Sequence, residues 1–389
     1  MPVLNRAAEL HDEVTGWRRR IHARPELGFE LAETASFVAE RLREFGCDTV
    51  ETGVGQTGVV AVIKGNRGDG PVIGLRADMD ALPIVETSGV DYTSELAGVM
   101  HACGHDGHTA MLLGAAKYLA ETRNFAGTCV LIFQPAEEIG QGALAMLEDG
   151  VLDRFGIDRV FGMHNMPGLK EGSFAIKPNG IMGSVSRFTL RVHGVGGHAA
   201  RPNRTVDPIV VASQIIVALQ TIVGRNTDPV SSVVVSITSI AAGTAFNIIP
   251  EHAEMLGTVR TLEGTQVEET RAGIERIARG IAEASGATID FEFDNPATVT
   301  FNHHTETELA ANVAADVAGE AGIDRDAKPV LAGEDFSHML NARPGAFIFI
   351  GNGETAGLHH PGYDFNDAII PQGISYWVRL TETALAPTA

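Results

Sequence analysis

The chain is poor in cysteine and in basic residues, and both shortages narrow its possible functions. Its 389 residues include only three cysteines, an odd and sparse set that excludes a disulfide framework and indicates a reducing compartment. It carries 29 Lys and Arg against 49 Asp and Glu, a formal net charge of −20, which argues against a nucleic-acid surface and an anionic membrane surface. A small anionic substrate stays compatible with this charge, because one local arginine suffices to bind it.

Signals for export and for membrane insertion are missing as well. The stretch MPVLNRAAELHDEV is charged throughout and lacks the basic start and apolar core of a signal peptide. No run of about 18 consecutive apolar residues occurs, the length expected of a membrane span. We therefore expect a cytoplasmic protein without a membrane partner.

Length and pattern predict an α/β domain that is interrupted by a second domain. A chain of 389 residues exceeds one ordinary hydrophobic core. Short runs rich in Val and Ile, separated by helical patterns, indicate the buried strands of a central mixed sheet. These runs are Gly58–Lys64, Val72–Arg76, Thr128–Phe133, Arg159–Met163 and Ala346–Ile350. The middle of the chain has the order β-α-β-β-α-β, typical of a ferredoxin-like α+β domain. We expect residues 1–183 and 298–389 to form the first domain and residues 184–297 the inserted one.

Polar side chains follow four of these strands. They are Asp78 and Asp80, Glu137 and Glu138, His164 and Asn165, and, after a Gly-rich loop, His359 and His360. In open α/β sheets, ligands bind beyond the carboxyl ends of the strands. We therefore expect these distant residues to converge on one edge of the sheet.

The densest cluster of reactive side chains is Met100–His108, which holds three His, one Cys and one Asp before an apolar helix. Imidazole, thiolate and carboxylate together suit a borderline-soft divalent metal such as Zn, Mn, Co or Ni. Cys103 and His105 are the candidate ligands here. Two alternatives stay open: a buried cysteine beside helix-capping residues, and a nucleophilic Cys103 with His105 or His108 as its base.

The adjacent carboxylates Glu137 and Glu138 are a second candidate feature. Such a pair is usually a solvated surface feature, but this one follows a buried strand and a proline. A metal that bound one carboxylate would relieve their repulsion and leave the other to take a proton from water. His164 is either a ligand or a core histidine. Asp80 either accepts a hydrogen bond from the second ring nitrogen of a ligand histidine or closes a local turn.

The inserted domain carries its polar candidates in loops and at strand ends. His198 lies in the Gly-rich stretch GVGGHAARP, which lacks the sequence context of a dinucleotide site or a P-loop. Asn247 and Arg260 end strands, and arginine is a natural partner of a substrate carboxylate. Their spacing alone favours ordinary exposed polar residues.

Together these stretches resemble the M20 metallopeptidase family, and most closely its amidohydrolase branch of hippurate hydrolases, N-acyl-amino-acid deacylases and auxin-conjugate hydrolases. The similarity covers nearly the whole chain. The matching stretches, in family order, are RRRIHARPELGFE, LRADMDALPI, MHACGHDGHTAMLLGAA, IFQPAEE, GMHNMP, GVGGHAARP, FNIIP, GTVRT, GEDFS and LHHPGYDFND.

The resemblance implies a catalytic domain with two divalent metal ions per subunit and an inserted lid that usually dimerises. The metal ligands it implies are Cys103, His105, Glu138, His164 and His359. It implies Glu137 as general base and His198 as the lid histidine that stabilises the oxyanion, often supplied by the partner subunit. Asn247 and Arg260 then contact the substrate.

The chain departs from most of the family at two positions. The usual His-x-Asp motif is here Asp78-Met79-Asp80, so its histidine is missing. Cys103 stands where other branches have a bridging Asp, and His105 is available as the replacement ligand. His360 is an alternative to His359, although the His-x-Pro pattern favours His359.

The function expected from these residues is metal-dependent hydrolysis of the amide bond of N-acyl amino acids, hippurate-like or N-acetylated, with Glu137 as the base for a metal-activated water. The alternative within the same fold is a dipeptidase or carboxypeptidase. A metal-dependent binding protein without catalysis is a third interpretation, which leaves Glu137 unused. The expected partners are a small-molecule substrate and a second copy of the chain, in a homodimer or a larger homo-oligomer.

Overall fold

The computed structural model describes residues 3–387, and the chain folds as two compact units. Unit 1 comprises Met1–Ile181, Thr300–Lys328 and Asp335–Ala389, and unit 2 comprises Met182–Val299 and Pro329–Glu334. The boundaries lie within two residues of those expected, except that the short segment 329–334 belongs to unit 2. Residues 329–334 show neither helical nor strand periodicity, so the sequence gives no sign that the chain returns to unit 2 there.

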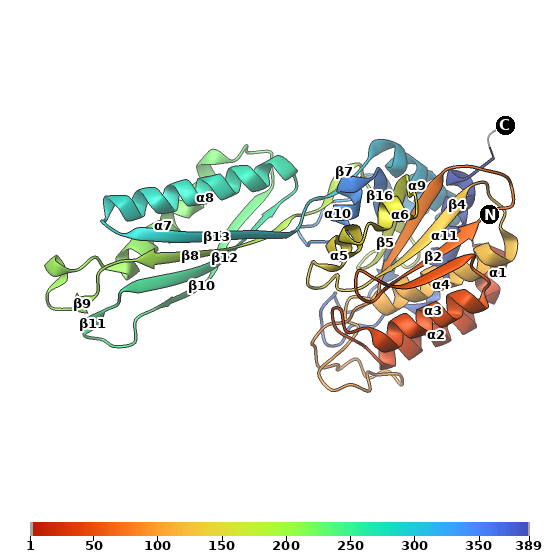
Figure 1. The fold of residues 1–389 in the computed structure, drawn as a ribbon, viewed down its shortest axis with the longest axis horizontal. Helices are drawn as coiled ribbons and strands as arrows, with labels where there is room; N and C mark the ends of the chain where they lie inside the picture. Colours follow the sequence, from red (N-terminus) through yellow and green to blue (C-terminus); the bar gives the residue numbers. More distant parts are fainter. Residues whose placement is uncertain (1–2, 388–389) are drawn as a thin grey trace. The chain divides into compact units, whose positions relative to one another are not determined.

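Unit 1 is built on an eight-stranded mixed sheet (Figure 1). In spatial order the strands are β1 (Thr49–Val54), β2 (Gly58–Lys64), β4 (Thr128–Gln134), β3 (Val72–Asp78), β5 (Arg159–Pro167), β16 (Gly345–Gly353), β6 (Phe174–Ala175) and β15 (Ile323–Asp324). The four central strands β4, β3, β5 and β16 run parallel to one another. Their carboxyl ends therefore meet at one edge, as the sequence predicts.

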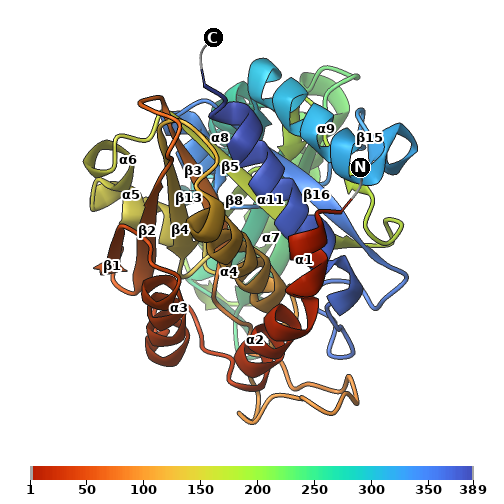
Figure 2. The ribbon, with the colours of Figure 1, turned by 90° about the vertical axis from the view of Figure 1, so that its right-hand side faces the viewer.

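Helices cover this sheet, and α4 is the one that carries the reactive cluster. It spans His105–Thr122 and is almost entirely buried. It packs against α2 and α11 (Figure 2), where Gly114 lets Ile374 approach closely. The other helices of unit 1 are α1 (Asn5–Glu9), α2 (His11–Ala23), α3 (Ala32–Glu44), α5 (Gly142–Glu148), α6 (Val151–Arg154), α9 (His304–Ala318), α10 (Ser337–Ala342) and α11 (Ile370–Ala384), with the 3₁₀ turns η3 (Glu320–Gly322) and η4 (Asp367–Ile369).

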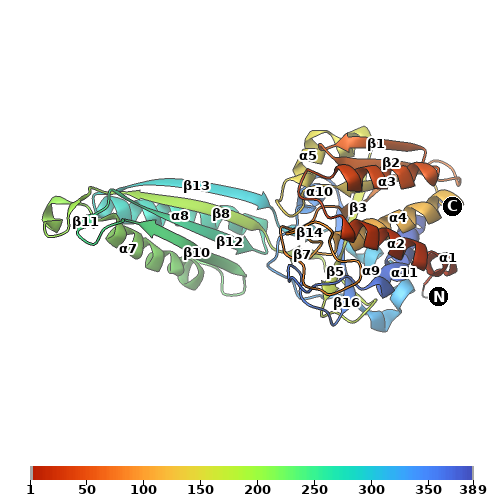
Figure 3. The same cartoon turned by 90° about the horizontal axis from the view of Figure 1, so that it is seen from below.

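Unit 2 is the ferredoxin-like domain that the sequence predicts. Its elements follow the order β8 (Val185–His193), α7 (Pro208–Thr221), β10 (Val233–Ala242), β12 (His252–Thr261), α8 (Gly264–Ala284) and β13 (Thr288–Ala297). The strands form an antiparallel sheet in the order β10-β12-β8-β13. Both helices pack on one face of it (Figure 3), where alternate strand residues such as Leu190 and Met255 are buried. The short elements of unit 2 are η1 (Pro202–Arg204), the π-helical turn η2 (Ile222–Asn226) and the ribbon of β9 (Gly197–His198) and β11 (Ile248–Ile249). A further short pair, β7 (Asn179–Met182) and β14 (Thr300–Asn302), lies where the chain leaves and re-enters unit 1.

One helical stretch of the described chain, Pro208–Asn226, is long and apolar enough to cross a membrane by length and composition alone. One side of it contributes Val211, Ile215 and Leu219 to the core of unit 2. Packing of this kind gives a core helix the same apolar composition.

Candidate metal centre

His105 is the first residue of α4, and its ring is oriented by the chain after β3. The preceding Gly104 takes a left-handed conformation (φ 93°), which turns the chain into the helix. His105 Nδ1 lies 2.8 Å from the backbone oxygen of Asp80. Because a carbonyl only accepts, Nδ1 carries the proton and Nε2 is left as a free lone pair, the form in which imidazole binds a metal.

His164 is presented in the same way from β5. Its Nδ1 donates to the backbone oxygen of Asn165 at 2.6 Å, and its Nε2 lies 3.4 Å from Cys103 Sγ. Two imidazoles are thus fixed by backbone carbonyls with their second nitrogens turned toward one thiol and its surroundings.

Glu137 and Glu138 occupy a turn that Asp80 holds. The two carboxylate oxygens of Asp80 accept hydrogen bonds from the backbone N–H groups of Glu137 (3.0 Å) and Glu138 (3.1 Å). The preceding Ala136 has a positive φ of 55°, a conformation that a non-glycine residue adopts only when its surroundings enforce it. Asp80 therefore orients both the candidate ligand His105 and the carboxylate pair.

His359 approaches the same place from the loop after β16. It also has a positive φ, 62°, and its backbone N–H donates to the oxygen of Ala102 at 2.8 Å, which joins the His359 loop to the segment that carries Cys103. His359 Nε2 lies 3.5 Å from Glu138 Oε2, with 54% of its side chain exposed. The neighbouring His360 uses its Nδ1 to accept a backbone N–H two residues further on, at 3.0 Å, so the geometry favours His359 as the ligand.

The structure brings all five candidate ligands together in two groups that share one thiol. Potential ligand atoms lie within 4.8 Å of one another in the group Cys103, His105 and His164 and in the group Cys103, Glu138 and His359. Within residues 3–387, His105 Nε2 and Glu138 Oε1 are buried without a hydrogen-bond partner, a costly state that a cation relieves. The donor set of one thiol, three imidazoles and one carboxylate fits borderline divalent ions, and Cys103 is common to the two groups.

The surroundings of Cys103 suit a metal ligand better than a nucleophile. Burial, together with the charge of Glu138, raises the pKa of the Cys103 thiol well above its usual range. Reactive cysteines instead lie in electropositive, partly exposed places that lower the pKa. Burial also raises the pKa of Glu138 to about 7, so both groups need a cation beside them to stay charged.

His108 is close to the cluster, but both of its ring nitrogens have protein partners. Its Nδ1 lies 2.7 Å from Asp78 Oδ1, and its Nε2 lies 2.7 Å from Asn165 Oδ1 and 3.0 Å from the backbone nitrogen of the same residue. Asp78 is also bound by the buried Arg76 at 2.6 Å. This role of Arg76 was not predicted, although an arginine inside the apolar run VIGLRAD is a signal for a buried ion pair.

The candidates of unit 2 lie in two separate places. His198 and Ile248 are paired in the β9–β11 ribbon, which puts Asn247 beside His198, whereas Arg260 lies near the far end of β12 (Figure 1). His252, at the start of β12, is close in sequence to the ribbon. Arg260 lies eight residues further along the strand, and at the usual rise per residue this is a distance of about 26 Å from His252. One copy of unit 2 therefore cannot bring both places to the same small substrate.

His198 is exposed, and its ring is held in one tautomer. Its Nδ1 accepts the backbone N–H of Ala200 at 3.1 Å, so in the neutral ring the Nε2 carries the proton. The side chain therefore offers an N–H donor. Arg260 donates to the backbone oxygen of Val259, and burial with the nearby charge of Arg187 lowers its pKa.

Gly104 permits the close packing between the two ligand-bearing segments. A Cβ there would overlap Asn165 Oδ1 and lie 2.6 Å from the hydroxyl of Tyr363. We expect Gly104→Ala to lower the free energy of unfolding by about 2–5 kcal/mol, the sum of left-handed strain and overpacking. Denaturant unfolding measures this. In the control Gly16→Ala, the new Cβ meets nothing within 4 Å, and stability should rise by about 0.5–1 kcal/mol. Equal effects of the two substitutions would contradict the packing argument.

Comparison with known proteins gives the same relationship over most of the chain. Residues 74–383 match the family model "Peptidase family M20/M25/M40". The chain is 43% identical over 380 residues to a hippurate hydrolase of Campylobacter jejuni, covering 98% of each chain. It is 41% identical over 365 residues to thermostable carboxypeptidase 2 of Saccharolobus solfataricus, covering 92% of this chain and 91% of that one.

A solved structure agrees with these sequence matches. The YXEP protein of Bacillus subtilis, described as a dinuclear metal-binding peptidase of the M20 family, has a TM-score of 0.86 and 37% identity, covering 97% of this chain and 99% of that one. The family match extends over well more than half of the chain, and the relatives match it nearly end to end. The chain is a hydrolase that belongs to the peptidase family M20/M25/M40, in its amidohydrolase branch.

Proposed function

We propose that the chain hydrolyses the amide bond of N-acyl amino acids with Glu137 as the general base. The observation that carries this proposal is the position of Glu137 beside the ligand groups. Its Oε2 lies 4.0 Å from His105 Nε2, while Glu138 is shared between His105 and His359 at 3.8 and 3.5 Å. Glu138 is thus the better ligand, which leaves the Glu137 carboxylate for proton transfer.

Cys103, His105, Glu138, His164 and His359 would hold two divalent ions. When bound, these ions polarise the scissile carbonyl and lower the pKa of a water molecule. Glu137 takes the proton of the attacking water and later delivers it to the leaving amine. Asp80 fixes the Glu137 backbone for this transfer, because it accepts the N–H groups of both glutamates.

We further propose that unit 2 acts as a lid in a homodimer. The N–H of His198 suits the oxyanion of the tetrahedral intermediate, Asn247 lies beside it, and Arg260 suits the substrate carboxylate. The separation of Arg260 from the His198 ribbon supports a substrate site to which two copies of the chain contribute residues. Exposed apolar side chains on α7 and on the edge strand β10, such as Val217 (72% exposed) and Ile240 (49%), support a partner on this unit.

A substrate panel with metal removal tests the proposed function. We expect N-benzoylglycine and N-acetyl amino acids to be cleaved, with activity lost after a chelator and restored by Zn, Mn, Co or Ni. Release of the free amino acid is the measurement. Cleavage that survives complete metal removal, verified by elemental analysis, would overturn the metal-dependent mechanism.

The carboxypeptidase relative favours one second candidate, a peptidase of the same chemistry. The same panel should therefore include dipeptides and acyl dipeptides. A kcat/KM at least tenfold higher for dipeptides would replace acyl amino acids as the substrate class. For location we propose the cytoplasm, because Cys47, Cys103 and Cys129 are all free thiols.

A further inference from the structure

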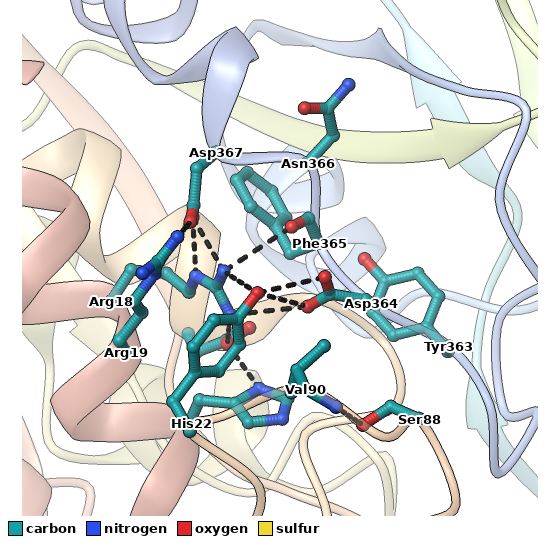
Figure 4. A network of polar contacts seen from close by, with 12 residues as sticks. Arg18, Arg19, His22, Ser88, Val90, Tyr363, Asp364, Phe365, Asn366 and Asp367 are labelled. Carbon is teal, nitrogen blue, oxygen red and sulfur yellow. Dashed lines mark hydrogen bonds and ion pairs between the residues drawn. The ribbon is translucent and has the colours of Figure 1, made fainter.

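A buried network of charged residues lies next to the metal centre and is not used by the hydrolytic mechanism. Its central members are Arg18 and His22, one turn apart on α2, and both side chains are completely buried. Figure 4 shows Arg18 beside Asp364 and Asp367, in the segment that follows His359, with His22 close to Arg18. Buried ion pairs are on average no more stabilising than apolar side chains of the same volume. What such a network does provide is a fixed geometry.

His22 connects the two segments that supply the metal ligands. Its Nδ1 lies 2.8 Å from Asp106 Oδ2, and Asp106 directly follows His105. Its Nε2 lies 3.2 Å from Glu86 Oε1. The next residue, Thr87, donates its backbone N–H to the oxygen of Pro361 at 2.7 Å, two residues beyond His359.

Both ring nitrogens of His22 thus face carboxylates, and only the imidazolium can donate to two acceptors. Burial opposes this charge, but the hydrogen bonds to Asp106 and Glu86 outweigh it and raise the pKa of His22 to about 9. His22 is therefore a cationic link at neutral pH.

Arg18 makes a second connection between the same two segments. Its Nη1 lies 3.6 Å from Asp106 Oδ2 and 3.5 Å from Asp364 Oδ1. Its Nε donates to Asp367 at 2.7 Å, and its guanidinium stacks on the ring of Tyr92 at 4.5 Å. Tyr92 closes the circuit with a hydrogen bond of 2.9 Å to Asp364.

We propose that Arg18 and His22 are positioning residues of the metal centre, which set the distance between the start of α4 with Cys103 and His105 and the loop with His359. This rests on the proposed function, in which the two segments both supply metal ligands. Loss of either link lets the His359 loop move relative to Cys103. The ligand atoms of Cys103, Glu138 and His359 would then be held less closely together, although no ligand has been removed.

The test is metal binding and geometry in His22→Gln and Arg18→Lys. We expect Zn²⁺ affinity, measured by chelator competition, to fall about 10–100-fold, the usual effect of losing a group that orients ligands. With Co²⁺, the thiolate-to-metal charge-transfer and d–d bands should shift. The kcat should fall by a similar factor with KM changed less than threefold.

Arg20→Met is the matched control. Arg20 lies on the same helix but is exposed, and its guanidinium lies over the ring of Phe37 at 4.5 Å, so metal affinity and Co²⁺ spectrum should stay within twofold of the parent protein. Tyr92→Phe, which removes only a hydroxyl, replaces Arg18→Lys if that variant does not fold, and should weaken Zn²⁺ binding by at least threefold.

Two outcomes separate the proposals. Parent-like Zn²⁺ affinity and Co²⁺ spectra in His22→Gln and in the Arg18→Lys or Tyr92→Phe variant would overturn the positioning role, even if stability fell. A parent protein that binds neither Zn²⁺ nor Co²⁺ would overturn the proposed function and the positioning role with it.

Discussion

Glu137→Gln should lower kcat by a factor of about 10²–10⁴ while leaving the metal content near that of the parent protein. The factor is the usual contribution of a general base, which a carboxamide cannot replace. Gln keeps the size of the side chain and the backbone N–H that Asp80 accepts, so the turn and the ligands around it should persist. Steady-state kinetics with elemental analysis of the same preparation measure both quantities.

Two other glutamates, Glu138 and Glu148, give this experiment its controls. Glu138→Gln should lose metal together with activity, because Glu138 lies between His105 and His359. Glu148→Gln, on the exposed side of α5, should change neither. A Glu137→Gln variant that kept more than a tenth of the parent kcat would exclude Glu137 as the base. If it lost its metal instead, Glu137 would be a ligand.

The sheet and the approximate place of the site are predictable from the sequence because both depend on local patterns. The runs Gly58–Lys64 and Thr128–Phe133 form β2 and β4 nearly residue for residue. The polar residues after β3, β4 and β5 converge because the carboxyl ends of parallel strands lie at the same edge of the sheet. The spacing of Cys103 and His105 beside an apolar helix indicates candidate ligands, and the structure places both in one group with His164.

What the sequence did not reveal depends on contacts between distant segments. The strand β1 (TVETGV) has mixed polarity, and it is held by pairing with β2. The link from His22 to Asp106 joins residues 84 positions apart, and no local period marks it. The positive φ of His359 is also set by tertiary contacts. Single positions of this kind lie outside what hydrophobic periodicity can detect.

Cys103→Ala should abolish stoichiometric metal binding and lower kcat/KM by at least about 100-fold. The expected loss exceeds the roughly 10–100-fold effect of removing a group that only orients a ligand, because Cys103 belongs to both ligand groups. Elemental analysis after gel filtration and steady-state kinetics measure the two effects. Cys129→Ala is the matched control: Cys129 is also buried, on β4, and its removal should leave metal content unchanged.

Cys103→Asp separates a bridging ligand from a nucleophile. A carboxylate could take the place of the thiolate in both ligand groups, so this variant should keep measurable metal and more activity than Cys103→Ala. A nucleophilic cysteine predicts the opposite pattern: both variants would retain metal, because the other four ligands remain, and both would be inactive. Burial and the charge of Glu138, which raise the pKa of the thiol, make it a poor nucleophile without a cation. Metal retention in Cys103→Ala is therefore the result that would return Cys103 to the role of attacking group.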